Sequence, residues 1–280
     1  MALAPLTLRS SSSLRPMLNK VPEVIAAFWV VKVLSTTVGE TFADFLNSDV
    51  GLGLWGTIGV MAAALAIAMV FQMRLRRYYP PVYWLVVVLV SIVGTLITDA
   101  LTDVYNVPLL GSTAVFSVAL AATFALWYRA EGTLSIHTIT TSKREAFYWL
   151  AILFTFSLGT AAGDYLSEDV GLGYTRTGLI IAGAILVVWL AYRYTSLGEV
   201  AAFWAAYVMT RPLGASLGDF LTASKDDGGR GLSTHIVSWV FFAAILGIVA
   251  WMTARQIRSV SAQSLPASEP LPAMEASPSA

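Results

Sequence analysis

Cysteine is absent from the 280-residue sequence, which excludes disulfides, thiolate nucleophiles and thiolate metal ligands. Histidine is nearly absent: His137 and His235 are the only two, and neither has a partner at a metal-ligand spacing. The chain also lacks the H-E-x-x-H, G-x-S-x-G, phosphate-loop and dinucleotide-binding motifs. These absences predict a protein that is not an enzyme, has no catalytic residues and needs no cofactor.

Charge is scarce, since charged residues make up 12% of the chain and hydrophobic residues 57%. Soluble domains average about 25% charged residues, so the composition predicts an integral membrane protein in contact with the lipid bilayer. The formal net charge is zero and no basic patch interleaves with aromatic residues, so nucleic acid is not an expected partner. A window of about 19 residues finds apolar segments at 23–46, 53–73, 81–101, 110–128, 145–166, 174–194, 199–221 and 233–254.

The two ends of the chain differ from this apolar middle. Residues 1–19 are rich in serine and lack the apolar core of a secretory signal, and residues 256–280 are rich in proline, alanine and serine. Such segments cannot bury enough apolar surface to fold. We expect disordered cytoplasmic tails at 1–19 and 256–280, on either side of a membrane domain at 20–255.

A frame of tryptophan, glycine and aspartate, Trp-x9-Gly-x4-Asp, recurs along the membrane domain. Its members are Trp29, Trp84, Trp149 and Trp204, then Gly39, Gly94, Gly159 and Gly214, then Asp44, Asp99, Asp164 and Asp219. The recurrence indicates internal repeats at 20–78, 79–141, 142–197 and 198–255, of which the first and third share the sequence DVGLG. Each unit holds two apolar segments, so the predicted fold class is all-α, with eight transmembrane helices in four two-helix repeats.

Lysine and arginine concentrate in the tails and in the loops that follow the second helix of each unit, whereas the opposite loops are acidic. The positive-inside rule therefore places both termini in the cytoplasm. All four units then point the same way, and parallel repeats imply pseudo-symmetry about the membrane normal. We expect the frame-bearing helices to surround this axis and the second helices to form an outer ring.

The frame aspartates lie near the outer ends of their helices, so around one axis they would converge on an outer vestibule. Rings of acidic side chains select cations in pores. The alternative is that each aspartate only caps a helix end in water.

Three charged residues break the symmetry of the repeat. Glu40 of the first unit is replaced by Thr95, Thr160 and Ala215 in the others, and Lys32 and Arg211 are each unique to their unit. Glu40 and Asp44 lie one helical turn apart, which makes them a candidate site for a metal ion or an exchanged proton. Lys32 and Arg211 are expected as internal counter-charges or gates, with Arg211 paired to Glu40 or an aspartate, and a purely structural salt bridge as the alternative.

The remaining candidates have both functional and structural interpretations. The hydroxyls of Thr36, Thr37, Thr95 and Thr160 offer oxygen ligands of the kind that suits Mg, Ca or Mn, or they join helices by hydrogen bonds. The frame glycines allow close packing, or with Pro212 they mark a broken helix with free carbonyls. The frame tryptophans form an interfacial belt or pack in the core.

Two segments, KVPEVIAAFWVVKVLSTTVGETFADFL and FWAAYVMTRPLGASLGDFL, resemble a family of bacterial membrane proteins known as a repeat of unknown function. The resemblance covers about residues 20–255. It implies the eight-helix plan and the bacterial inner membrane, and it implies no activity. GETFAD is also similar in content, but not in order, to the Glu-x-Gly-Asp motifs of cation exporters, which is analogy alone.

These patterns favour a transporter of a small cation, divalent and manganese-like, exported in exchange for protons. Glu40 and the frame aspartates would bind or relay the ion. A membrane scaffold or sensor is the first alternative, and a carrier of an organic solute, with an aromatic cavity near Trp29 and Trp204, is the second. The sequence leaves open whether the protein forms a homo-oligomer.

Overall fold

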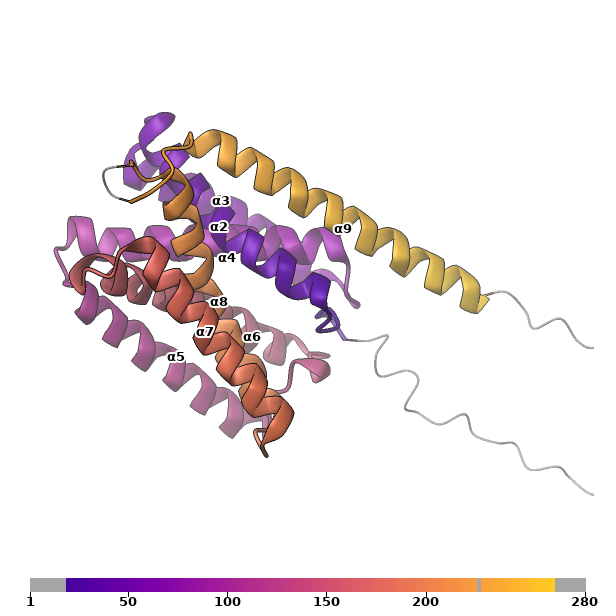
Figure 1. Cartoon of the computed structure of the whole chain (residues 1–280). Coiled ribbons are helices and arrows are strands. Elements are labelled where there is room, and N and C mark those ends of the chain that lie inside the picture. The colour runs from indigo at the N-terminus through magenta and orange to yellow at the C-terminus, as the bar shows by residue number, and fades with distance from the viewer. Residues whose placement is uncertain (1–18, 226–227, 265–280) are drawn as a thin grey trace, which may run out of the picture.

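The computed structural model describes residues 19–225 and 228–264, with side chains up to residue 258. This part of the chain contains eight α-helices and no strand (Figure 1), as the all-α class requires. The helices are α2 (Ala26–Asp44), α3 (Gly53–Arg74), α4 (Pro80–Asp99), α5 (Leu109–Glu131), α6 (Ser142–Asp164), α7 (Gly173–Tyr194), α8 (Glu199–Thr222) and α9 (Thr234–Ser264).

The predicted C-terminal tail is helical over its first residues, because α9 continues to Ser264. Between Gly247 and Pro266 the sequence contains no proline or glycine, and the residue before a proline is disfavoured in a helix. The rest of that tail, 265–280, and residues 1–18 of the predicted N-terminal tail lie outside the described residues.

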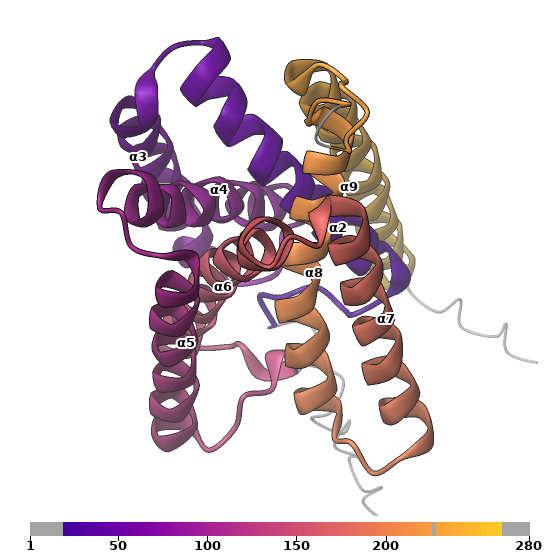
Figure 2. The same cartoon turned by 60° about the vertical axis from the view of Figure 1, so that its left-hand side comes forward.

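The first helices of the four units, α2, α4, α6 and α8, form an inner ring in which each packs against the next and α8 packs back against α2. The second helices lie outside this ring. Each packs mainly on the first helix of the following unit, with α3 on α4, α5 on α6, α7 on α8 and α9 on α2. Figures 1 and 2 show α9 alongside α2, so the last of the described helices packs back onto the first.

Glycine at the frame position lets neighbouring inner helices approach closely. A methyl group on a frame glycine would overlap a residue of the next inner helix. That residue lies three positions before the frame glycine of its own helix. The four pairs are Gly39 with Ser91, Gly94 with Phe156, Gly159 with Arg211 and Gly214 with Thr36. The same contact therefore recurs around the ring, which gives the inner helices pseudo-fourfold symmetry.

Replacing Gly214 with alanine tests this packing. We expect Gly214→Ala to lower the free energy of unfolding by about 1–3 kcal/mol, because the new Cβ would overlap Thr36 and meet the carbonyl of Val33 at 3.0 Å. Thermal unfolding in detergent measures the change. The matched control is Gly183→Ala on α7, where a Cβ meets nothing and helix propensity improves. Equal stability of the two variants would contradict the close approach.

Three inner helices end in a wider, π-helical turn directly after the frame aspartate, over Phe45–Asp49, Ala100–Val104 and Tyr165–Asp169. In the fourth unit, α8 instead stays α-helical past Asp219 to Thr222. After the first and third turns, Gly51 and Gly171 have φ values of 76° and 74°, which residues with a side chain rarely adopt. This conformation explains why these two units share DVGLG.

Six helices in the described ranges are long and apolar enough to cross a membrane: α3, α4, α5, α6, α7 and α9. The outer helices bury little of their surface in the protein, whereas α4 and α6 are mostly buried. Large apolar side chains such as Leu179 and Val187 therefore face outward, which indicates a membrane location. Of the eight predicted spans, α2 and α8 fall short in apolar character because each contains several charged residues.

Candidate functional site

In each inner helix, five residues at a spacing of four form a row, since residues four apart lie on nearly the same face of an α-helix. Equivalent residues form layers, which we name by a distinctive member. From the helix N-termini they are the tyrosine layer (Phe28, Tyr83, Tyr148, Phe203), the lysine layer (Lys32, Val87, Ile152, Tyr207), the arginine layer (Thr36, Ser91, Phe156, Arg211), the glutamate layer (Glu40, Thr95, Thr160, Ala215) and the aspartate layer (Asp44, Asp99, Asp164, Asp219). All residues of the first four layers are buried, so side chains fill the ring.

Arg211 connects α8 to the other three inner helices. Its Nη2 donates to Glu40 Oε2 at 2.5 Å, to Thr160 Oγ1 at 2.7 Å and to the hydroxyl of Thr95. Its Nη1 donates to the Thr36 carbonyl at 3.4 Å. The side chain is fully buried. The partner of Arg211 is therefore Glu40 and not an aspartate, and the threonines that replace Glu40 in two other units hold the same guanidinium.

Thr36 and Thr37 use their hydroxyls to join α2 to α8. Thr36 Oγ1 donates to the carbonyl of Thr210 at 3.3 Å, and Thr37 Oγ1 donates to the carbonyl of Gly214 at 3.0 Å. These bonds fit the interhelical role that the sequence left open for them. The hydroxyls that reach Arg211 are those of the glutamate layer.

Lys32 is fully buried in the lysine layer and forms no ion pair within the described ranges. Its Nζ lies 3.9 Å from the centre of the Phe156 ring and 4.4 Å from that of Tyr207. It has no hydrogen-bond partner in this part of the chain. Lys32 was expected to be the counter-charge of a carboxylate. In the structure its ammonium group faces aromatic rings instead. The layers thus contain two buried cations and one buried carboxylate, Glu40.

The frame aspartates converge at the C-terminal end of the ring, beyond the glutamate layer. Asp44 is exposed, and Asp99, Asp164 and Asp219 are half-buried. Each of these three carboxyl groups is close enough to Glu40 and Asp44 for electrostatic repulsion. Among the described residues, no three His, Asp or Glu side chains lie close enough together to hold a metal ion. Glu40 and Asp44 were expected to form a metal site, but the Glu40 carboxylate forms an ion pair with Arg211 in the structure.

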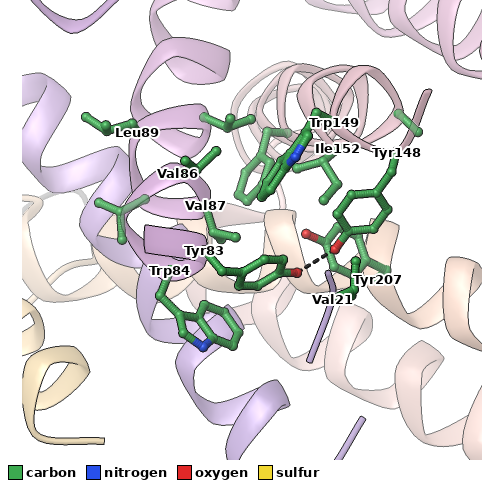
Figure 3. Packing of buried hydrophobic residues seen from close by; sticks show 14 of the residues in the cluster. Val21, Tyr83, Trp84, Val86, Val87, Leu89, Tyr148, Trp149, Ile152 and Tyr207 are labelled. Atoms are coloured by element: carbon green, nitrogen blue, oxygen red, sulfur yellow. Dashed lines mark hydrogen bonds between the residues drawn. The ribbon is translucent and has the colours of Figure 1, made fainter. Parts of the chain in front are cut away.

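The tyrosine layer fills the N-terminal end of the ring, and sequence reasoning did not find it. Figure 3 shows the hydroxyls of Tyr83 and Tyr148 hydrogen-bonded to each other. The hydroxyl of Tyr207, in the next layer, has no hydrogen-bond partner among the residues described. A signal was available in the sequence, because an aromatic residue directly precedes every frame tryptophan.

The frame tryptophans pack in the core more than in an interfacial belt. Trp84, Trp149 and Trp204 are buried, and Trp29 is half-buried. Trp204 Nε1 donates to the carbonyl of Leu134 at 3.0 Å. The tryptophans therefore hold the N-terminal ends of the inner helices together.

A second buried ion pair, which the sequence analysis did not find, lies at this end of the ring. Lys20 Nζ and Glu145 Oε2 are 2.5 Å apart, and Gln72 Nε2 donates to Glu145 Oε1 at 2.9 Å. The amide of Lys20 donates to the carbonyl of Ile139 at 3.1 Å. We call residues 19–22 the N-terminal strap; its Val21 is buried in the same core cluster as Tyr83 (Figure 3). The strap covers the N-terminal end of the layers.

Gly39 and Pro212 do not break their helices, which was the alternative to close packing. The helix α2 continues through Gly39 to Asp44, and α8 contains Pro212 in its interior. The ring of Pro212 packs against α6, where a Cβ on Gly163 would lie 3.3 Å from it. The proline is therefore part of the contact between α6 and α8, and the irregular turns come later, after the aspartates of three units.

A family model described as "Repeat of Unknown Function (DUF347)" matches residues 27–78, 82–133, 147–197 and 202–258, more than half of the chain. Each match contains one inner helix, the outer helix that follows it and one frame tryptophan. Neither the curated proteins nor the solved structures compared with the chain include a match.

Proposed function

The chain belongs to the Repeat of Unknown Function family, and from its site we propose that it moves a small cation across the bacterial inner membrane along the axis of the inner ring. All eight helices span the bilayer in this proposal, with the pseudo-symmetry axis along the membrane normal. The charged residues Lys32, Glu40 and Arg211 of α2 and α8 are compatible with spanning because they lie buried among the inner helices, as intramembrane charges usually do. Both termini lie in the cytoplasm, no step is enzymatic, and the aspartate layer opens outward.

One observation supports this proposal above the others: a tethered cation, the Arg211 guanidinium, occupies a buried cage of oxygen atoms. The cage consists of the Glu40 carboxylate, the hydroxyls of Thr95 and Thr160 and the carbonyl of Thr36. Carboxylate, hydroxyl and carbonyl oxygens are also the ligands that Mg, Ca and Mn prefer. A substrate cation competes with Arg211 for the same oxygens, so Arg211 acts as a gate.

The layers suggest how an ion would pass. The aspartate layer makes the outer end of the ring attractive to cations, while the Arg211–Glu40 pair and the aromatic side chains keep the ring closed. The cation enters the cage when Arg211 leaves Glu40, and Arg211 returns when the cation leaves. We propose export of a divalent ion such as Mn²⁺ in exchange for protons.

A cavity favours a second candidate, a carrier of a small organic solute. It has a volume of about 690 Å³ and lies between α2, α7 and α8, with Trp29, Trp189, Tyr192 and Phe203 among its lining residues. Ligand pockets commonly measure about 300–1,000 Å³ and are mostly apolar. The cavity includes Trp29, as this alternative requires, but not Trp204.

Flux through liposomes tests the proposed function. Purified protein with Mn²⁺ outside and a pH-sensitive dye inside is expected to move Mn²⁺ and protons in opposite directions. Glu40→Gln should reduce both movements to the level of protein-free liposomes, because the cage loses its only charge. The matched control is Glu23→Gln, an exposed residue before α2, which should transport normally.

Folded protein that moves none of a panel of divalent ions would overturn the proposal. Uptake of a fluorescent organic cation by the same liposomes, retained in Glu40→Gln and lost when Trp29 is replaced by alanine, would then support the second candidate. If neither assay detects transport, the remaining interpretation is a membrane scaffold whose ion pairs only hold the helices together.

A further inference from the structure

Lys32 is the one buried cation of the layers whose charge no carboxylate balances within the described residues. A lysine inside a membrane protein is costly, and such residues usually serve a function. The faces of Phe156 and Tyr207 stabilise its ammonium in part. A cation that is held only by aromatic rings keeps its proton less firmly than one in an ion pair, which makes Lys32 suited to releasing it.

The surroundings of Lys32 couple it to Arg211 and to no carboxylate in direct contact. On α8, Tyr207 covers the ammonium and Arg211 repels it electrostatically. On α6 the neighbour is Phe156, and on α4 the residue of the same layer is Val87. Glu40 lies two helical turns further along α2, about 12 Å in rise. The charge that Lys32 experiences therefore depends on where Arg211 is placed.

We propose that Lys32 carries the proton that is exchanged for the cation: it is protonated while Arg211 holds Glu40 and neutral while the cation holds Glu40. The inference rests on the proposed function and assigns its coupling residue. When a cation takes Glu40, Arg211 and Lys32 are left without a carboxylate between them. Only Lys32 can relieve this repulsion, because a guanidinium does not lose its proton in proteins.

The proton-transfer step balances without a further reactant. One N–H bond of the ammonium breaks, the electron pair stays on Nζ as a neutral amine, and the proton passes to water on the cytoplasmic side. The unpartnered hydroxyl of Tyr207 lies in the same layer, and the bonded hydroxyls of Tyr83 and Tyr148 lie in the next. These groups offer a line of hydroxyls toward the N-terminal end of the ring. The reverse step restores the ammonium when Arg211 returns to Glu40.

Proton release on Mn²⁺ binding, followed with a pH dye in weakly buffered detergent solution of the full chain, tests the assignment. The wild type is expected to release on the order of one proton for each Mn²⁺ bound. Lys32→Met should bind Mn²⁺ and release none. Lys32→Arg keeps the cation but cannot release its proton, so it should weaken Mn²⁺ binding by at least about tenfold. The matched control is Lys143→Met, an exposed lysine, which should behave as wild type.

The outcomes separate this inference from the proposed function. Folded wild type that binds neither Mn²⁺ nor any other ion of the divalent panel overturns both. Binding with the same proton release in Lys32→Met overturns the inference alone, because the proton then comes from Glu40 or an aspartate. If Lys32→Met does not fold, unaltered Mn²⁺ affinity and proton release in Lys32→Arg would overturn the inference by themselves.

Discussion

Arg211→Met is expected to lower the free energy of unfolding by about 3–5 kcal/mol, the usual cost of removing one partner of a buried ion pair. The variant leaves the Glu40 carboxylate without its counter-charge in a buried site. The hydroxyls of Thr95 and Thr160 lose their contact with the guanidinium as well. Chemical or thermal unfolding in detergent, followed by tryptophan fluorescence, measures the loss.

The double variant Glu40→Met/Arg211→Met provides the control for this prediction. Replacing a buried ion pair with apolar side chains of similar size is often neutral for stability, so the double variant should recover most of the loss. Recovery would show that the single variant suffers from an unpaired charge and not from lost packing. A single variant as stable as wild type would contradict the buried pair itself.

Features that repeat in the sequence could be predicted well. The Trp-x9-Gly-x4-Asp frame predicted four units, and the inner helices and their close contacts at Gly39, Gly94, Gly159 and Gly214 follow it. The pairing of Arg211 with Glu40 could also be predicted, because only the first unit has a carboxylate at this position of the repeat. Periodicity and broken symmetry are both visible in one sequence.

Features that depend on which segments meet in space could not be predicted. No local sequence signal shows that each outer helix packs on the inner helix of the next unit. The loop sequences would look the same if each outer helix packed on the inner helix of its own unit. Lys32 was paired with carboxylates by charge alone, whereas its neighbours Phe156 and Tyr207 come from two other units. The helices that contribute the ion pair, α2 and α8, look least like membrane spans because each contains charged residues.

The N-terminal strap illustrates the same limit, because it is held by residues far away in the sequence. Lys20 Nζ contacts Glu145 and donates to the Met73 carbonyl at 3.1 Å, and the Tyr78 amide donates to the Asn19 carbonyl at 3.0 Å. Lys20 and Glu145 are 7% and 1% exposed, so this pair is as buried as the one at the centre of the ring. The strap connects units one, two and three at the cytoplasmic end in the proposed orientation.

Glu145→Leu is expected to detach the strap while the inner ring stays folded. The Lys20 ammonium would lose its buried partner, at a cost of about 3–5 kcal/mol, and it can avoid this cost by moving into water. Hydrogen exchange of the Lys20 and Tyr78 amides should then become about 100- to 4,000-fold faster, because each 1.4 kcal/mol corresponds to a factor of ten. The control Glu131→Leu removes the carboxylate that pairs with Lys143 and Arg144 and should leave both amides protected. Unchanged exchange in Glu145→Leu would mean that Val21 and the backbone bonds hold the strap without the ion pair.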